Sequence, residues 1–268
     1  MPQNQLLYLS KADVEAIGVT MAEIVESLAV TFRAKGEGRT EMPPKPGIHP
    51  GSGDSFIHAM PAYIPDLKSA GIKWIAAFPE NPKKGLPYIT GLLIFNDVAT
   101  GLPLAVMDGV WMTAMRTGAA TALSARYLAR PESSVVGVLG CGVQGRSNVE
   151  ALNVLFPLER VMAYDLDTGA ARRYAEEIID ALFPGDPLLA VAKSTAADAQ
   201  TAPRSTWRGH LEWFALIVPS PMSALTGTSK DGKVSRRCLD NTGPRRFLVV
   251  EFDSGDMEGQ AARLLYLG

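Results

Sequence analysis

A glycine-rich turn constrains the fold of this chain more than any other feature. Residues 140–145 read Gly-Cys-Gly-Val-Gln-Gly and follow the short apolar run 135–139. Such a run is typical of a strand buried on both faces of a parallel sheet, and residues 145–155 have the pattern of a helix. A glycine turn between strand and helix lets the backbone approach a pyrophosphate at the helix N-terminus, where N–H groups and partial positive charge favour phosphate. The alternative is a glycine-rich turn that binds nothing.

Asp165 strengthens the dinucleotide interpretation. It closes the next expected strand, 160–164, and lies 20 residues after Gly145. An acidic side chain near that spacing hydrogen-bonds the ribose hydroxyls of NAD and repels the 2′-phosphate of NADP. We therefore expect NAD(H) to be favoured over NADP(H).

Strand and helix patterns alternate after this turn, with a helix expected over 168–182 and a strand over 188–192. This alternation predicts an α/β fold with a parallel, Rossmann-type sheet. The preceding part of the chain predicts an N-terminal α+β domain. Its expected elements are a helix at 20–34 with a capping box at Thr20, short strands within 40–66, strands at 72–78, 88–96 and 102–108, and a helix at 112–128. The chain-breaking residues 131–134 place the boundary between domains 1–130 and 131–268.

The pattern weakens after about residue 202. Strands are expected at 213–218 and 247–252 and a short helix at 258–267, with no convincing helical periodicity between 219 and 246.

Composition excludes several classes of protein. Apolar residues make up 47% and charged residues 20%, which argues against a disordered chain. The 26 basic and 28 acidic residues argue against a general nucleic-acid binder. The longest apolar stretch, 135–143, is too short for a membrane helix, and the first residues do not resemble a signal peptide. Two cysteines, Cys141 and Cys238, predict neither a disulfide framework nor a metal cluster, so a cytoplasmic setting is expected.

Arg116 is a second candidate for function. It is a lone arginine among small residues in the expected helix 112–128, with Thr113, Thr117 and Ala120 at helical spacing around it. That face would let a ligand approach closely, and an arginine there could hold a carboxylate through two hydrogen bonds. A surface arginine explains the pattern equally well.

Five motifs in order carry a resemblance to a known family. They are His58-Ala-Met-Pro-Ala-Tyr63, Gly71-Ile-Lys73, Leu104-Ala-Val-Met-Asp-Gly109, Thr113-Ala-Met-Arg-Thr-Gly118 and Gly140-Cys-Gly-Val-Gln144. Over most of residues 5–200 the chain resembles the ornithine cyclodeaminase/mu-crystallin family. That family contains amino-acid cyclodeaminases, alanine dehydrogenases, ketimine reductases and ligand-binding crystallins.

The resemblance implies a substrate-binding and dimerisation domain, a Rossmann domain, a cleft between them and a homodimer. It also implies that Lys73 and Arg116 hold the substrate carboxylate, with Arg39 as a further ligand, and that Gln144 and Asp165 contact the cofactor. We assign a further group to the cofactor site, namely Thr113, Thr117, Gly140, Gly142 and Val143. In family enzymes hydride passes between NAD and the α-carbon of an amino acid or its imine.

Lys73 also has an ordinary structural explanation. A lysine between Ile72 and Trp74 in an apolar strand can extend its ammonium group to water. If it is instead desolvated in the site, its pKa would fall and it could relay a proton.

The chain departs from the family at several positions. His58 stands where ornithine cyclodeaminases have a glutamate, which disfavours ornithine as substrate, although a simple hydrogen-bonded histidine is as plausible. Lys45 resembles the dehydrogenase-like branch and is either a substrate ligand or an exposed loop charge. Asp253, in the run Val-Glu-Phe-Asp-Ser, is the candidate for the late catalytic aspartate that binds the substrate amine.

The chain stops at Gly268, before the helices that usually complete the Rossmann domain in this family. With the weak match after about residue 202, this suggests a frameshift or strong divergence. The main expectation is an NAD-dependent amino-acid dehydrogenase or imine reductase that acts on a small amino or imino acid. The alternatives are an ornithine-type cyclodeaminase that releases ammonia, a non-catalytic mu-crystallin-like binder, and an inactive truncated remnant.

Overall fold

The structure is a computed structural model that describes residues 5–51, 53–158, 160–182, 185–192 and 200–210, with short strands at 216–218, 227–228, 234–235 and 250–251. The chain divides into two units, Met1–Ala125 and Arg126–Gly268, which are taken separately below. This division lies inside a helix and slightly before the boundary expected at residue 130.

The first unit contains a six-stranded sheet in the order β1-β6-β5-β4-β3-β2. Strand β1 pairs parallel with β6, and every other neighbouring pair is antiparallel. The strands are β1 (Leu7–Leu9), β2 (Gly47–Ile48), β3 (Phe56–Ile64), β4 (Ser69–Ala77), β5 (Ile89–Asn96) and β6 (Pro103–Asp108). Single-turn helices η1 (Pro65–Leu67) and η2 (Pro82–Lys84) follow β3 and β4. The strands expected at 72–78, 88–96 and 102–108 are therefore present, while β1 was not expected.

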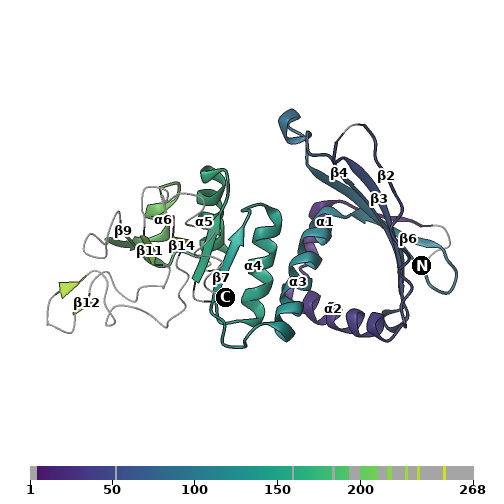
Figure 1. Ribbon diagram of the computed structural model, residues 1–268, viewed down its shortest axis with the longest axis horizontal. Coiled ribbons are helices and arrows are strands. Elements are labelled where there is room, and N and C mark those ends of the chain that lie inside the picture. The colour runs from purple at the N-terminus through teal and green to yellow at the C-terminus, as the bar shows by residue number, and fades with distance from the viewer. Residues whose placement is uncertain are drawn as a thin grey trace. The chain divides into compact units, whose positions relative to one another are not determined.

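Helices α1 (Lys11–Ala16), α2 (Met21–Gly36) and α3 (Val110–Leu128) lie together on one side of this curved sheet (Figure 1). Helix α2 begins at the predicted capping box. The Thr20 hydroxyl accepts a hydrogen bond from the Glu23 N–H, and the Glu23 carboxylate accepts one from the Thr20 N–H. Ser10 and Asp13 form an equivalent box at the start of α1.

The two faces of the sheet differ in burial. Ile75 and Ala77 on β4 are buried, and so is Ala105 on β6, which the register places on the same face. We call this the inner face. On the opposite, outer face Trp74 and Leu92 are directly paired, and each exposes nearly half of its surface. Because neighbouring residues of a strand point to opposite faces, Lys73 lies on the inner face with Ile75.

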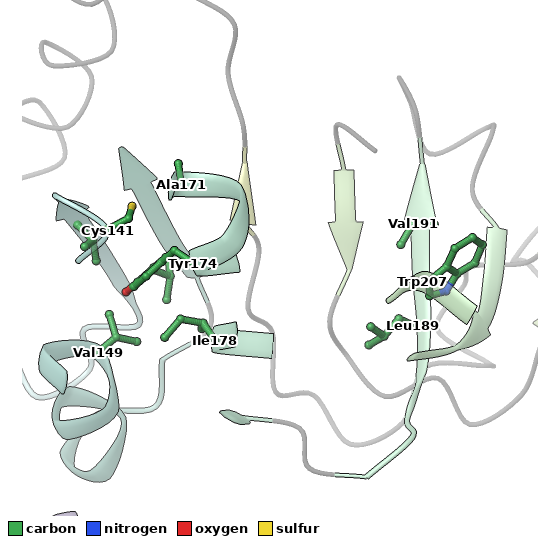
Figure 2. Close-up of a cluster of buried hydrophobic side chains, with 10 residues drawn as sticks. Cys141, Val149, Ala171, Tyr174, Ile178, Leu189, Val191 and Trp207 are labelled. Carbon is green, nitrogen blue, oxygen red and sulfur yellow. The ribbon is translucent and has the colours of Figure 1, made fainter. Parts of the chain in front are cut away.

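The second unit begins with β7 (Val135–Leu139), α4 (Val143–Leu155), β8 (Arg160–Tyr164) and α5 (Thr168–Leu182), as the sequence predicts. Strands β7 and β8 are parallel, with Leu139 opposite Tyr164. Tyr174 of α5 is fully buried in the core cluster, and Figure 2 shows its ring among Cys141, Val149 and Ile178. Leu189, Val191 and Trp207 belong to the same cluster.

The expectation of a parallel sheet throughout is wrong beyond β8. Strand β9 (Leu188–Ala192) pairs antiparallel with both β10 (Gln200–Pro203) and β11 (Leu216–Val218), and β11 pairs antiparallel with β14 (Val250–Glu251). A parallel neighbour needs a crossover of about a dozen residues or more, and the segment between Ala192 and Gln200 is shorter than that. The remaining elements are α6 (Arg204–Trp207) and the pair β12 (Gly227–Thr228) and β13 (Val234–Ser235).

Several expectations fall on residues outside the described ranges. These are Asp253, the helix at 258–267, the first half of the strand expected at 213–218 and most of the strand expected at 247–252. Among the helices that the structure does describe, none is long and apolar enough to cross a membrane.

Candidate functional site

The glycine-rich turn lies where β7 ends and α4 begins. Gly140 has a φ of +93°, a backbone conformation that glycine adopts without strain, and its N–H donates to the Tyr164 carbonyl at 2.8 Å. The turn therefore continues the β7–β8 pairing by one residue and then reverses into the helix. Gly142 is the residue that precedes the first turn of α4.

The other two glycines of the motif, Gly142 and Gly145, differ in whether packing requires the absence of a side chain. A Cβ on Gly145 would lie 2.5 Å from the Gly140 carbonyl oxygen and 3.2 Å from a Val138 methyl group, so close packing of helix on strand excludes a side chain there. A Cβ on Gly142 would meet no protein atom within 4 Å, and its φ of −82° is open to any residue. Neither packing nor backbone conformation requires glycine at 142. The open space above it matches what a pyrophosphate close to the backbone needs.

Asp165 is tied directly to this turn. Its Oδ2 accepts a hydrogen bond from the Cys141 N–H at 2.7 Å, and its Oδ1 accepts one from the Asp167 N–H at 2.9 Å. These hydrogen bonds, that from Cys141 foremost, hold the pKa of Asp165 below its usual range. The carboxylate is thus fixed at the end of β8, next to the turn, with acceptor capacity left on each oxygen.

Two residues that hydrogen-bond to the glycine turn, Arg146 and Tyr174, were not predicted from the sequence. The Arg146 Nη1 donates to the Cys141 carbonyl at 2.6 Å, and the buried Tyr174 hydroxyl donates to the Gly145 carbonyl at 3.0 Å. The Arg146 guanidinium also lies over the Tyr174 ring and pairs with Glu177. Cys141 is buried, which raises the pKa of its thiol to about 11. No local pattern could have revealed these contacts, because α5 supplies Tyr174 and Glu177 from far along the chain.

In the first unit, the positive charge of Arg116 acts on Lys73. Lys73 is half-buried on the inner face of β4, and its pKa falls to about 8 through desolvation first and then through the positive charges of Arg116 and Lys45. Desolvation also lowers the pKa of Arg116, although part of that side chain is open to solvent. Within the described part of the chain, neither residue has a carboxylate or a hydrogen-bond partner. Two unneutralised cations in a partly desolvated place can bind an anion.

The start of α3 positions Arg116. The Gly109 N–H donates to the Gly91 carbonyl at 2.9 Å, and the Asp108 carboxylate accepts from the Val110 N–H at 2.9 Å. The hydroxyl groups of Thr113 and Thr117 donate back to the carbonyls of Gly109 and Thr113. Both threonine hydroxyl groups therefore donate their hydrogen bonds within the helix, and only their oxygen lone pairs are available to a ligand.

His58 has a well-defined place on β3. Its ring stacks on Phe56 with centroids 4.1 Å apart and meets His49 edge-on at 6.2 Å. Its pKa is lowered by desolvation first and then by Lys45 and His49. The register places His58 opposite Ile75, on the same inner face as Lys73.

Arg39 differs from the other predicted cations because carboxylates already surround it. It donates to Glu37, through its Nε at 2.9 Å, and it pairs with Asp66 of η1. These partners raise the pKa of Arg39, with Asp66 the larger cause. The positive charges of Arg116 and Lys45 thus act on Lys73, and that of Lys45 acts on His58, whereas Arg39 is held in ion pairs of its own.

Most of the predicted cofactor residues lie together in the second unit, whereas Thr113 and Thr117 lie on α3 in the first unit. Gly140, Gly142, Val143 and Gln144 form the turn, with Asp165 bonded to it, and the side chains of Val143 and Gln144 are exposed. Asp253 lies outside the described residues, so its role stays a prediction.

Comparisons with known proteins identify a family and several relatives. A family model described as the ornithine cyclodeaminase/mu-crystallin family matches residues 5–199. Alanine dehydrogenase of Archaeoglobus fulgidus is 41% identical over 170 residues, which cover 63% of this chain and 51% of that protein.

Two solved structures are similar to about two thirds of the chain. The Delta(1)-pyrroline-2-carboxylate reductase of Thermococcus litoralis, in complex with NADH and L-proline, is 37% identical with a TM-score of 0.63, covering 66% of this chain and 54% of the other. An archaeal alanine dehydrogenase dimer with bound NAD is 39% identical with a TM-score of 0.61, covering 66% and 53%.

The chain spans about half the length of the curated relatives it matches. The family model nevertheless matches well over half of this chain, including both groups of site residues. The chain therefore belongs to the ornithine cyclodeaminase/mu-crystallin family.

Proposed function

We propose that this chain is an NAD-dependent oxidoreductase that transfers hydride at the α-carbon of a small amino acid or of its imine. The observation that carries the proposal is the presence of both half-sites in one chain. The second unit has a glycine turn with open space at Gly142 and a fixed carboxylate at Asp165. The first unit has the unneutralised pair Lys73 and Arg116.

Asp165, Gly142 and the N-terminus of α4 would hold the cofactor. The free acceptor positions of the Asp165 carboxylate suit ribose hydroxyls, and its negative charge disfavours a 2′-phosphate. The first N–H groups of α4 suit the pyrophosphate, with Val143 and Gln144 exposed beside it. When bound, NAD supplies the hydride acceptor, or NADH the donor, for the reaction.

Arg116 and Lys73 would bind the carboxylate of the substrate. The guanidinium can form two parallel hydrogen bonds to it, which fixes the orientation of the α-carbon. With a pKa of about 8, Lys73 exists in both protonation states near neutral pH, so it can also exchange a proton with the substrate amine.

Oxidation or reduction of an amino or imino acid is favoured over ornithine cyclodeamination. A cyclodeaminase must also bind a distal ammonium group, and the inner face around His58 offers cations and imidazoles there instead. This supports a dehydrogenase or imine reductase as the reaction.

A homodimer is part of the proposal, formed through the outer face of the six-stranded sheet. Ile48, Trp74 and Leu92 all lie on this face and expose about half of their surface, and Tyr8 exposes 73%. Several large exposed apolar side chains on one face favour an interface there, and the archaeal alanine dehydrogenase neighbour is a dimer. A cytoplasmic location stays a prediction that rests on the few cysteines.

The experiment that tests the proposal is a calorimetric titration of the purified chain with NADH and, in parallel, with NADPH. Tight binding of NADH alone is expected. A screen of amino acids with NAD⁺, and of 2-oxo acids with ammonia and NADH, then follows the nicotinamide absorbance. Arg116→Ala should abolish turnover and leave NADH binding unchanged. NADH binding without turnover of any substrate would favour the non-catalytic binder, and no binding of either nucleotide would favour an inactive remnant.

A further inference from the structure

The backbone of Cys141 is held on both sides. Its N–H donates to the Asp165 carboxylate at 2.7 Å, and its carbonyl accepts from the Arg146 Nη1 at 2.6 Å. The peptide that follows is trans, so its carbonyl oxygen and its N–H point in opposite directions. The bond from Arg146 therefore directs the N–H of Gly142 away from the guanidinium. Within the described part of the chain that N–H has no hydrogen-bond partner, so it is available to a ligand.

Gly142 by itself would not keep this orientation. A Cβ there would meet no protein atom within 4 Å, and glycine adopts positive φ about as readily as negative φ. Rotation of the 141–142 peptide would thus meet little resistance from the residue itself. It would replace the N–H donor of Gly142 with the carbonyl oxygen of Cys141, which repels phosphate. The bond from Arg146 opposes this rotation, because the rotation would break it.

The Arg146 side chain is in turn held by α5. Tyr174 and Glu177 lie three residues apart on this helix and so share a face. The guanidinium carbon of Arg146 lies 5.5 Å from the centroid of the Tyr174 ring, and its Nε pairs with Glu177. A stacked ring and a charged partner position the guanidinium before any ligand arrives, which lowers the entropic cost of binding.

We propose that Arg146 is a positioning residue for the cofactor, which holds the 141–142 peptide so that the N–H of Gly142 faces the pyrophosphate of NAD(H). Arg146 acts through the backbone of Cys141 and not by direct contact with the phosphates. The inference rests on the proposed function, because it concerns the cofactor site of that function.

Two probes that differ in the pyrophosphate test this role. The full chain is titrated with ADP-ribose, which carries the pyrophosphate, and with adenosine, which has the base and the ribose but no phosphate. In Arg146→Met the affinity for ADP-ribose and for NADH should fall about tenfold or more, while that for adenosine stays within about twofold. General loosening of the turn would weaken both probes alike, because Asp165 bonds to the same turn. Arg146→Lys keeps a donor for the Cys141 carbonyl and should recover most of the affinity.

Further variants and salt complete the design. Arg130→Met changes an exposed arginine of the same unit and should keep both affinities. Glu177→Ala removes the partner of the Arg146 Nε, so ADP-ribose affinity should fall by a smaller factor; this variant decides the matter if Arg146→Met does not fold. The loss in Arg146→Met should persist at high salt, because salt screens attraction between charges far more than a hydrogen bond that orients a peptide.

Equal loss for both probes, full ADP-ribose affinity in Arg146→Met or, if that variant does not fold, in Glu177→Ala, or a loss that disappears at high salt would overturn the positioning role. Each of these results leaves the proposed function standing if the wild type still binds NADH and turns over substrate. The expected losses in a wild type that transfers no hydride keep the role of Arg146 and remove the reaction. No binding of NADH or ADP-ribose by the wild type overturns both.

Discussion

The carboxylate of Asp165 accepts a hydrogen bond from the backbone N–H of Cys141, with 2.7 Å between N and Oδ2. This contact joins the end of β8 to the glycine turn after β7. The same side chain that would select the ribose therefore also fixes the loop that would bind the phosphates.

Asp165→Asn should test both roles together. The amide keeps one acceptor oxygen for the Cys141 N–H but removes the negative charge that disfavours a 2′-phosphate. We expect NADH affinity to fall and the preference for NADH over NADPH to shrink by about tenfold or more, as loss of about 1.4 kcal/mol would produce. Parallel calorimetric titrations with NADH and NADPH measure both affinities and hence the preference. Unchanged discrimination would remove Asp165 from the ribose site.

Two glycine substitutions separate ligand binding from packing. Gly145→Ala places a methyl group against the Gly140 carbonyl and should lower the free energy of unfolding by about 1–3 kcal/mol. Gly142→Ala meets no protein atom, so its thermal stability should stay close to wild type while its NADH affinity falls about tenfold or more. Denaturant unfolding and NADH titration of both variants make the comparison. Full NADH affinity in Gly142→Ala would contradict a pyrophosphate at this position.

Lys73 should make stability depend on pH. Its pKa is about 8 in the folded chain against 10.5 for an ordinary lysine. Between these values the unfolded chain binds more protons, so the contribution of Lys73 to the free energy of unfolding rises with pH from about 8 to 10.5. Below pH 8 the partly desolvated positive charge of Lys73 lowers the free energy of unfolding by about 1 kcal/mol. The effect is this small because the side chain is half exposed.

Lys73→Met removes that cost. Its melting temperature should exceed the wild-type value by about 2–4 °C at pH 7, and the gap should narrow by pH 10. Calorimetry across this range measures the gap, with Lys84→Met as the matched control. A gap that is constant with pH would show that Lys73 titrates normally.

A charge on the outer face should disrupt the dimer. Trp74→Glu would bury a carboxylate in the proposed interface, which costs several kcal/mol without a partner. We expect wild type to elute as a dimer in size-exclusion chromatography with light scattering, and Trp74→Glu to elute as a folded monomer. Leu86→Glu, an exposed apolar residue outside the sheet, is the control and should remain dimeric. Dimeric Trp74→Glu would place the interface elsewhere.

Local features of the fold could be predicted from the sequence because neighbouring residues create them. The Thr20–Glu23 capping box, for example, joins groups that are only three residues apart. The antiparallel pairing of β9 was not predictable in this way. The pattern of an apolar strand is the same whether its neighbours run parallel or antiparallel, and β10 carries too weak a pattern to be recognised.

In the candidate site, too, local features followed from the sequence and long-range contacts did not. The sequence by itself determined the glycine turn, the spacing to Asp165 and the alternation that puts Lys73 on the face of Ile75, since backbone geometry and strand periodicity are local properties. Only the tertiary structure decided that Arg116 and Lys45 act on Lys73, that the His58 ring lies over Gly47, and that Arg39 is held by Glu37 and Asp66. The physical reason is that charge and desolvation act through space, so the pKa of a lysine depends on which distant segments the fold brings to it.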